Sequence, residues 1–354
     1  MTKPKSIQLG DYDKAFMRLL LHYPAIASEH VLSIMKNLGY ERSIKYNSSR
    51  LRQLCGARDN PSDKKYSHRK INKTGLYLTY NPYYMVSYGA EHGETTSGRV
   101  GLYSLTTLGA RAIGYDKEAL PQRSTRYGWA YYHQSGFLEQ ALSSGIPLSD
   151  ISTAIDYKRS RYYGERMPMW ILLSFPHGRY LINFTVSGYT GLDTAYSWNS
   201  ALSFASNPNV RSESYVIITP RSRFVALLKS LLLRGSVYRT HLVPYDDSTI
   251  VFSDLRKSPD YYLDLLVSHL GVDDFGPSYG SYHFPHSGRY YGNRIYLCEF
   301  VSGNMRTFCN LVQHSESLNV PVYCLVREWQ LPILSEFAPP TPIYNYVVYE
   351  HMRE

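Results

Sequence analysis

The stretch GLYSLTTLGARAIG, residues 101–114, decides the fold of the first part of the chain. Residues 102–106 alternate apolar and polar side chains, which is typical of a half-buried strand. Thr106 and Thr107 are both suited to cap a helix, and the residues after them place apolar side chains on one helical face. The stretch therefore predicts a strand that leads directly into a short helix.

Three helical patterns precede this stretch, at 11–23, 29–38 and 42–55, and Ser28 is a suitable cap for the second. The third pattern is apolar on one side and carries basic and amide side chains on the other. Three short helices of which the last is basic are typical of a helix-turn-helix, in which that last helix enters the major groove of DNA.

Positive charge is concentrated around the third helix. Residues 41–73 hold ten lysines and arginines against three acids, so this segment supplies +7 of the net charge of +9. A basic patch of this kind favours phosphate contacts, and we expect double-stranded DNA as the partner. The residues predicted to contact DNA are Arg42, Lys45, Asn47, Arg50, Arg52, Lys64, Lys65, Arg69 and Lys70.

A hairpin is predicted between the third helix and the opening stretch. Strand patterns at 75–88 and 99–106 flank a polar loop that contains Glu91 and Glu94. The order of helix, helix, basic helix, hairpin and short helix predicts a winged-helix domain over residues 1–115. The two acids argue against entry of the loop into a DNA groove.

The pattern Tyr103-x-Leu105-Thr106-x-x-Gly109-x-x-Ala112 follows a second helix that begins in YPAIASEHV (23–31). It resembles the winged-helix half of the replication-relaxation family of plasmid and mobile-element proteins, over about the first third of the chain. The resemblance implies a DNA-binding role in the replication, mobilisation or maintenance of a plasmid, phage or other mobile element. It also implies assembly with a second copy or with replication and mobilisation proteins.

The rest of the chain predicts a linker at 116–130 and an α/β domain at 131–354, because strand and helix patterns alternate there. RYLINFTVSG (179–188) echoes RIYLCEFVSG (294–303), which suggests an internal duplication. The predicted fold class is thus α+β overall, with a winged helix-turn-helix followed by an α/β domain.

The resemblance implies a restriction-endonuclease-like fold for this second part. Such nucleases hold a divalent ion with an acid at one strand end and an acid and a lysine on the next strand. Here the two acids would fall near Met169 and Asn183, and Thr185 takes the place of the lysine. In the second echo Glu299 is followed by Val301 at the lysine position. The sequence therefore favours a catalytically silent domain without a metal site or cofactor, and a divalent metal is expected only if the domain is a nuclease.

Enzymatic alternatives stay open. His286-Ser-Gly-Arg289, then His314 and Tyr323, resemble the constellation of tyrosine recombinases, in which basic side chains neutralise a phosphate that the phenol attacks. Asp193 stands where that family has its first arginine. A nickase or strand-transfer enzyme is thus one alternative, and a winged-helix transcriptional repressor with a ligand-sensing domain is another.

Two arginine–tyrosine stretches, YKRSRYYGER (157–166) and HSGRYYGNR (286–294), combine charge and rings in a way suited to a nucleic-acid backbone. We expect both to be surface loops, and solvated turns or a subunit interface would account for them equally well. The four cysteines form no CxxC pair, which argues against a zinc site or a disulfide framework. No signal peptide or membrane-spanning run is visible. We expect a cytoplasmic protein in a reducing compartment, without membrane partners.

Overall fold

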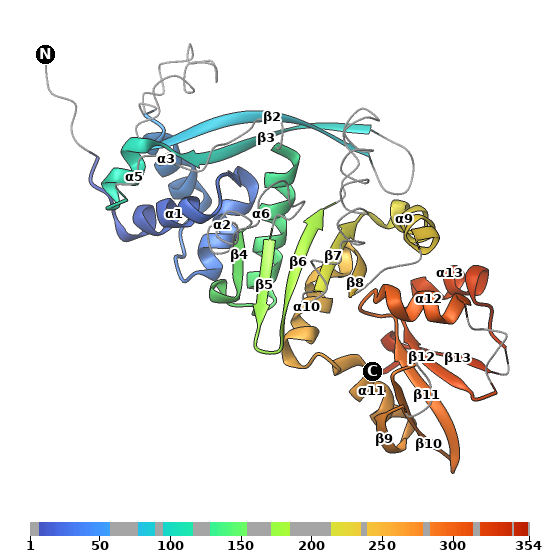
Figure 1. Ribbon diagram of the computed structural model, residues 1–354. Helices are drawn as coiled ribbons and strands as arrows, with labels where there is room; N and C mark the ends of the chain where they lie inside the picture. Colours follow the sequence, from blue (N-terminus) through green and yellow to red (C-terminus); the bar gives the residue numbers. More distant parts are fainter. Residues whose placement is uncertain are drawn as a thin grey trace, which may run out of the picture. The chain divides into compact units, whose positions relative to one another are not determined.

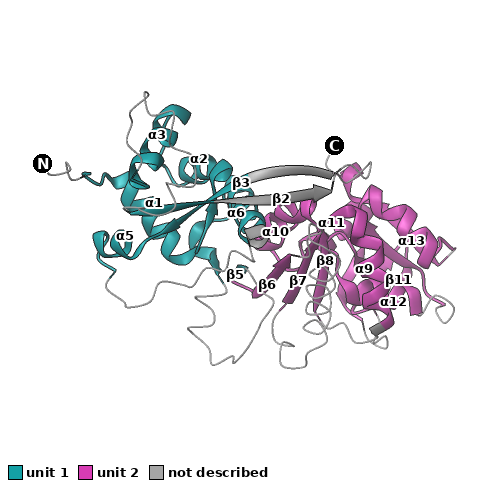
Figure 2. Ribbon diagram, turned by 90° about the horizontal axis from the view of Figure 1, so that it is seen from above, with its two compact units in different colours: residues 1–172, 186–191 teal, residues 173–185, 192–354 magenta. Residues whose placement is uncertain are grey.

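The computed structural model contains ten α-helices and three β-sheets within the residues that it describes, so the mixed α/β class is confirmed (Figure 1). The chain divides into two compact units, unit 1 at 1–172 with 186–191 and unit 2 at 173–185 with 192–354 (Figure 2). The described residues are 7–56, 77–88, 95–115, 128–153, 171–184, 214–234, 239–278, 284–313, 319–341 and 343–352.

Unit 1 is mainly helical around one small sheet. Its strands lie in the order β1-β3-β2, and both pairs are antiparallel. Its elements are α1 (Asp11–His22), β1 (Ile26–Ala27), α2 (Ser28–Asn37), α3 (Ile44–Leu54), β2 (Leu78–Tyr88), β3 (Thr95–Leu105), α5 (Thr107–Ala112), α6 (Gly128–Ser143), a 3₁₀ turn (Leu148–Asp150) and β4 (Ile151–Thr153).

The opening stretch folds as predicted, because β3 runs directly into α5. Thr106 caps the helix by accepting a hydrogen bond from the amide of Gly109 (2.9 Å), and its hydroxyl donates to the carbonyl of Tyr77 (3.0 Å). A Cβ at Gly109 would overlap that same carbonyl oxygen. The glycine in the motif therefore allows α5 to pack closely against the chain that enters β2.

The three helices predicted before the hairpin are also confirmed, with small shifts of their ends. α3 begins at Ile44 rather than Arg42, because Ser43 caps it by accepting a hydrogen bond from the amide of Tyr46 (3.2 Å). Arg42 therefore precedes the helix. The strand β1 was not predicted, since two residues are too few for an alternating pattern.

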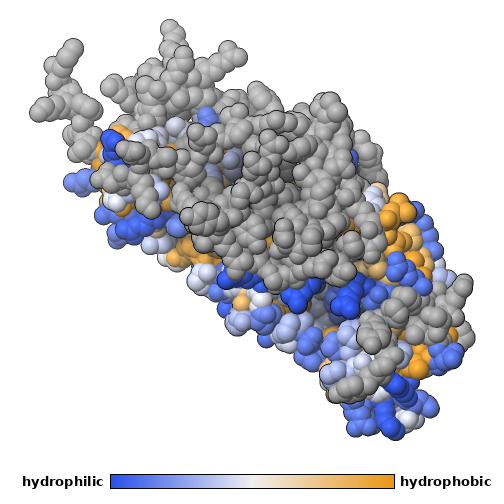
Figure 3. All heavy atoms as spheres, in the orientation of Figure 1, coloured by the Kyte–Doolittle hydropathy of each residue, from blue (hydrophilic) through white to orange (hydrophobic). Residues whose placement is uncertain are grey.

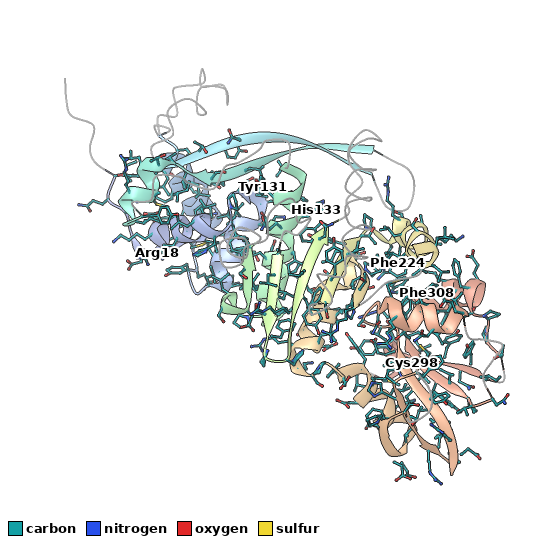
Figure 4. All side chains as sticks on the ribbon, in the orientation of Figure 1. Arg18, Tyr131, His133, Phe224, Cys298 and Phe308 are labelled. Carbon is teal, nitrogen blue, oxygen red and sulfur yellow. The ribbon has the colours of Figure 1, made fainter. Side chains whose placement is uncertain are left out.

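The helix α6 packs in unit 1, although the sequence placed residues 131–144 at the start of the second domain. The hydroxyl of Ser135 accepts a hydrogen bond from the amide of Ala27 (3.0 Å), and Tyr131 joins a buried cluster with Leu102 of β3. Figure 4 shows Tyr131 on this helix. α6 also begins inside the predicted linker, of which residues 116–127 lie outside the description.

Unit 2 is built on two sheets. In the first sheet, the strands of unit 2 lie in the order β5-β6-β7-β8, and β6, β7 and β8 are parallel. The other has the order β13-β12-β11-β10-β9, in which β11, β12 and β13 are parallel and β9, β10 and β11 antiparallel. The first part comprises β5 (Ile171–Phe175), which starts at the unit boundary, β6 (Gly178–Phe184), β7 (Ser214–Thr219), α9 (Arg221–Arg234), β8 (Thr240–Pro244), a 3₁₀ turn (Tyr245–Asp247), α10 (Ser248–Lys257) and α11 (Tyr261–Leu270). The second part comprises β9 (Asp273–Pro277), β10 (His286–Tyr290), β11 (Asn293–Glu299), α12 (Met305–Gln313), β12 (Val322–Val326), a 3₁₀ turn (Glu328–Gln330), α13 (Leu331–Phe337), β13 (Tyr344–Val348) and a last turn (Tyr349–Met352).

The two parts of unit 2 repeat one arrangement. In each, two strands joined by a two-residue turn are followed by two parallel strands, β7 and β8 or β12 and β13. β6 and β11 carry the two echoed segments and occupy the equivalent place. The arrangement is consistent with the internal duplication that the echo suggests, which stays a prediction.

The two parts are joined by aromatic packing and by one short turn. Phe224 of α9 contacts Trp329 and Phe300 with ring centroids 4.9 and 6.5 Å apart, and Phe300 stacks on Phe308 of α12 (Figure 4). In the turn after β11, the carbonyl of Gly303 accepts a hydrogen bond from the amide of Leu242 on β8 (2.8 Å). The edge of the first sheet is thereby fixed to the second.

The surface of unit 2 over α9 includes apolar side chains. Leu233, near the end of that helix, is 88% exposed, and apolar residues of this region reach the surface (Figure 3). None of the helices in the described segments has the length and apolar character needed to cross a membrane.

His241 should make unit 2 sensitive to acid. It lies on β8 beside the carbonyl of Ser302 (3.1 Å), and burial lowers its pKa from 6.5 to about 4. The unfolded chain therefore binds more protons than the folded chain between these values, and stability falls as the pH falls through this window. From pH 7.5 to pH 5 we expect the wild type to lose about 2 kcal/mol more than His241→Asn, which keeps a donor for Ser302 but does not titrate. Urea unfolding at both pH values measures this, and equal losses would contradict it.

Candidate nucleic-acid interface

The helix α3 has two sharply different sides. Asn47, Leu51 and Leu54 are buried against the rest of unit 1. Ile44 is 72% exposed and Tyr46 is 44% exposed, which is unusual for large apolar side chains. The exposed residues at the start of the helix and along it are Glu41, Arg42, Ser43, Ile44, Lys45, Tyr46, Ser48 and Arg52, and we call them the α3 face.

Arg50, predicted as a DNA contact, lies on the side of α3 that packs against α1. Its Nη2 is 2.5 Å from Oδ2 of Asp13 on α1, its Nε also donates to that carboxylate, and its Nη1 donates to Gln53 (3.1 Å). These hydrogen bonds to Asp13 raise the pKa of the guanidinium. The Asp13 side chain is 2% exposed and the Arg50 side chain 17% exposed. This ion pair therefore holds α3 against α1.

Asn47 is likewise a structural residue and not part of the α3 face. Its side-chain oxygen accepts a hydrogen bond from the hydroxyl of Tyr12 on α1. Burial and the neighbouring Asp13 raise the pKa of that Tyr12 hydroxyl, which keeps it protonated as a donor. The Tyr12 ring packs edge-on against Tyr40 and Tyr46, with centroids 6.3 Å away in both cases.

The α3 face has the side chains that duplex DNA requires. Lys45 and Arg52 present cationic donors to solvent, and Arg42 lies over the ring of Tyr46 at 5.4 Å. Lysine and arginine bind phosphates and the acceptors of guanine, while an exposed aliphatic side chain such as Ile44 suits the methyl group of thymine. The face therefore offers, on one helix, side chains of the kinds that contact the DNA backbone and the bases.

The remaining predicted DNA contacts fall outside the described residues. Lys64, Lys65, Arg69 and Lys70 lie within 57–76, and Glu91 and Glu94 lie within or beside the loop between β2 and β3. The strands on either side of that loop form a hairpin with continuous pairing from Leu78–Leu105 to Tyr88–Thr95.

The described members of the recombinase-like constellation are not brought together at one site. His286 and Arg289 both lie on β10, and residues three apart on a strand point to opposite faces of the sheet. Arg289 pairs with Asp274 (3.4 Å), and His286 stacks on Phe275. Tyr323 lies on β12, and His314 is outside the described residues.

The structure also corrects the expectation that HSGRYYGNR is a surface loop. Its first five residues form β10, and Tyr291 and Gly292 make the turn into β11, both with positive φ. Tyr290 contacts the ring of Tyr323, with centroids 5.4 Å apart. The other arginine–tyrosine stretch, 157–166, lies outside the described residues.

The nuclease positions that the structure describes hold no catalytic arrangement. Asn183 is buried in β6. Glu299 accepts hydrogen bonds from the amide (2.9 Å) and hydroxyl (2.6 Å) of Ser302, and burial raises its pKa. It thus closes the turn after its own strand, and Val301 follows where a lysine would be needed. Met169 and Thr185 lie outside the described residues.

No model of a known protein family, no curated protein and no solved structure matches the chain. What the protein does is therefore inferred from its own residues.

Proposed function

We propose that the protein binds double-stranded DNA through the α3 face, and that the elements from α1 to α5 form a winged helix. The element order α1-β1-α2-α3-β2-β3-α5 with the sheet order β1-β3-β2 supports this fold. In such a domain the third helix enters the major groove, and the hairpin flanks it.

The observation that carries the proposal is the separation of α3 into an anchored and an exposed side. Arg50 and Asn47 hold the helix to α1, so its position does not depend on the partner. Arg42, Lys45 and Arg52 are exposed to solvent, and so is Ile44. Packing within the described part of unit 1 therefore does not explain why these side chains lie on α3. A rigid helix with cations and one exposed aliphatic side chain is suited to read DNA.

The resemblance noted in the sequence supports a role in the replication, mobilisation or maintenance of a plasmid, phage or other mobile element. In this proposal unit 2 is catalytically silent and serves assembly or further DNA contact. The alternative, a transcriptional repressor, would bind DNA through the same α3 face. It would differ from the proposed role in that a ligand bound to unit 2 would release the DNA.

The test is a gel shift with short duplexes from around the protein's own gene, at several salt concentrations. We expect Lys45→Ala with Arg52→Ala to weaken binding about tenfold or more, and to lower the slope of log K against log salt by about 2, because two phosphate contacts are lost. The control, Lys229→Ala with Arg306→Ala, removes the same charge from exposed residues of unit 2 that lie outside the arginine–tyrosine stretches, and should leave binding unchanged.

Equal weakening by both double variants would show that net charge and not the α3 face binds the DNA, and would overturn the proposal. A parallel denaturing gel with and without Mg²⁺ tests the enzymatic alternatives. A nicked or protein-linked strand that Tyr323→Phe abolishes would establish strand cleavage instead.

A further inference from the structure

Four charged side chains of unit 2 meet at the carboxyl ends of its parallel strands. Arg221 follows β7, Asp247 follows β8, Arg327 follows β12 and Glu350 follows β13. Asp247 Oδ1 lies 3.1 Å from Nη2 of Arg221 and 3.7 Å from Nη1 of Arg327, and Arg327 Nη1 is 3.5 Å from Glu350. In α/β proteins this edge of a parallel sheet is where ligands bind.

The Arg327 guanidinium is buried and only partly used. Its side chain is 6% exposed, and its Cζ lies 5.2 Å from the centroid of the Tyr349 ring. Within the described residues, its Nε and Nη2 have no hydrogen-bond partner. These two N–H groups lie on one edge of the guanidinium and point in parallel, which is the fork that holds two oxygens of one acid group.

Two further polar atoms near Arg327 also lack a hydrogen-bond partner. Oδ2 of Asp247 and the indole Nε1 of Trp329 are buried without a hydrogen-bond partner in the described part of the chain. Trp329 belongs to the same cluster, because Arg221 lies 5.2 Å over its ring. Native proteins satisfy nearly all buried polar groups, so three donors and one acceptor in one cluster indicate a polar occupant.

We propose that this cluster binds a phosphate group that retains one proton. Two phosphate oxygens accept from the Arg327 fork, and the P–OH donates to Oδ2 of Asp247. An ionised carboxylate has no proton to donate to Asp247. Inorganic phosphate still carries at least one proton at neutral pH, and a phosphate monoester keeps one in part of its molecules because its second pKa is about 6. The two arginines and two acids balance, so the cluster does not repel an anion.

Two members of the cluster reach the protein surface. Arg221 is 45% exposed and Glu350 38% exposed as side chains, while Arg327 and Asp247 are buried at 6% and 8%. In this proposal the phosphate approaches from the side of Arg221 and Glu350. This inference is independent of DNA binding by α3, which lies in unit 1.

The test is isothermal titration calorimetry of the full chain with inorganic phosphate, at constant ionic strength. We expect one saturable site, at least tenfold weaker binding in Arg327→Lys, which keeps the charge but loses the fork, and unchanged binding in Arg289→Lys. The Lys45→Ala, Arg52→Ala variant should bind phosphate like the wild type, which separates this site from the DNA interface.

Sulfate supplies the second measurement, because it carries no proton at neutral pH. The wild type should prefer phosphate to sulfate about tenfold or more, and Asp247→Asn should lose this preference since its amide can donate to either ion. Tighter binding of a nucleoside 5′-monophosphate than of phosphate would assign the group to a nucleotide, and equal binding to the free ion. No saturable phosphate binding, or wild-type affinity in Arg327→Lys, would mean that water fills the cluster and would overturn the proposal.

Discussion

Replacing Arg50 by methionine should lower the free energy of unfolding of unit 1 by about 3–5 kcal/mol. Methionine keeps the apolar stem but leaves the carboxylate of Asp13, 2% exposed, without its cation. Removal of one partner from a buried ion pair has this large effect because the remaining charge stays away from water. The amide of Gly10 donates a hydrogen bond to the Asp13 carboxylate (2.8 Å), but this one neutral donor does not replace the lost cation.

The change is measured by urea unfolding of the full chain, with hydrogen exchange to assign the affected transition to unit 1. Arg289→Met is the matched control, because Arg289 and Asp274 are 62% and 78% exposed. An exposed pair contributes about 0–1 kcal/mol, so this variant should be close to wild type. A loss below about 1 kcal/mol in Arg50→Met would show that Arg50 does not anchor α3 and is available to DNA after all.

Gly303→Ala should destabilise unit 2 by about 2–5 kcal/mol. Gly303 has φ +71°, a left-handed conformation that costs an L-residue about 1–2 kcal/mol. A Cβ here would also overlap the carbonyl oxygen of Leu242, so β8 would have to move away from the turn and lose the hydrogen bond between Leu242 and Gly303. Crowding of this kind adds about 1–3 kcal/mol.

Gly271→Ala is the matched control, because it carries the backbone strain without the crowding. Gly271 ends α11 with φ +64°, but nothing lies within 4 Å of the position that a Cβ would take. Its substitution should therefore cost only the backbone strain of about 1–2 kcal/mol. If the two alanine variants unfold at the same urea concentration, the turn after β11 does not hold β8.

The helices of unit 1 were predictable because their apolar residues recur with the helical period and their ends carry recognisable caps. Several elements of unit 2 were not predicted, for identifiable reasons. The run Thr249-Ile250-Val251-Phe252 of α10 is β-branched and aromatic and therefore has no clear helical signature. The turn between β10 and β11 has Tyr291 at a positive φ, where asparagine or aspartate is the usual signal.

The candidate site was predictable as a helix but not residue by residue. Period and charge identified α3, yet they do not distinguish a cation that faces solvent from one that faces a neighbouring helix. Arg50 pairs with Asp13, 37 positions earlier, and this partnership follows only from the packing of α1 on α3. The Arg327 cluster had no sequence signal, because its members come from four separate strand ends.

The division of α3 into an anchored and an exposed side has a consequence for evolution and engineering. Substitutions at Ile44, Lys45, Ser48 or Arg52 leave the contacts of Asn47 and Arg50 intact. Under the proposed DNA-binding role, they should therefore alter which DNA sequence is preferred without a penalty in folding. Specificity can thus diverge rapidly between descendants of this chain while the scaffold stays constant. A library confined to these four positions is accordingly the natural starting point for retargeting the helix.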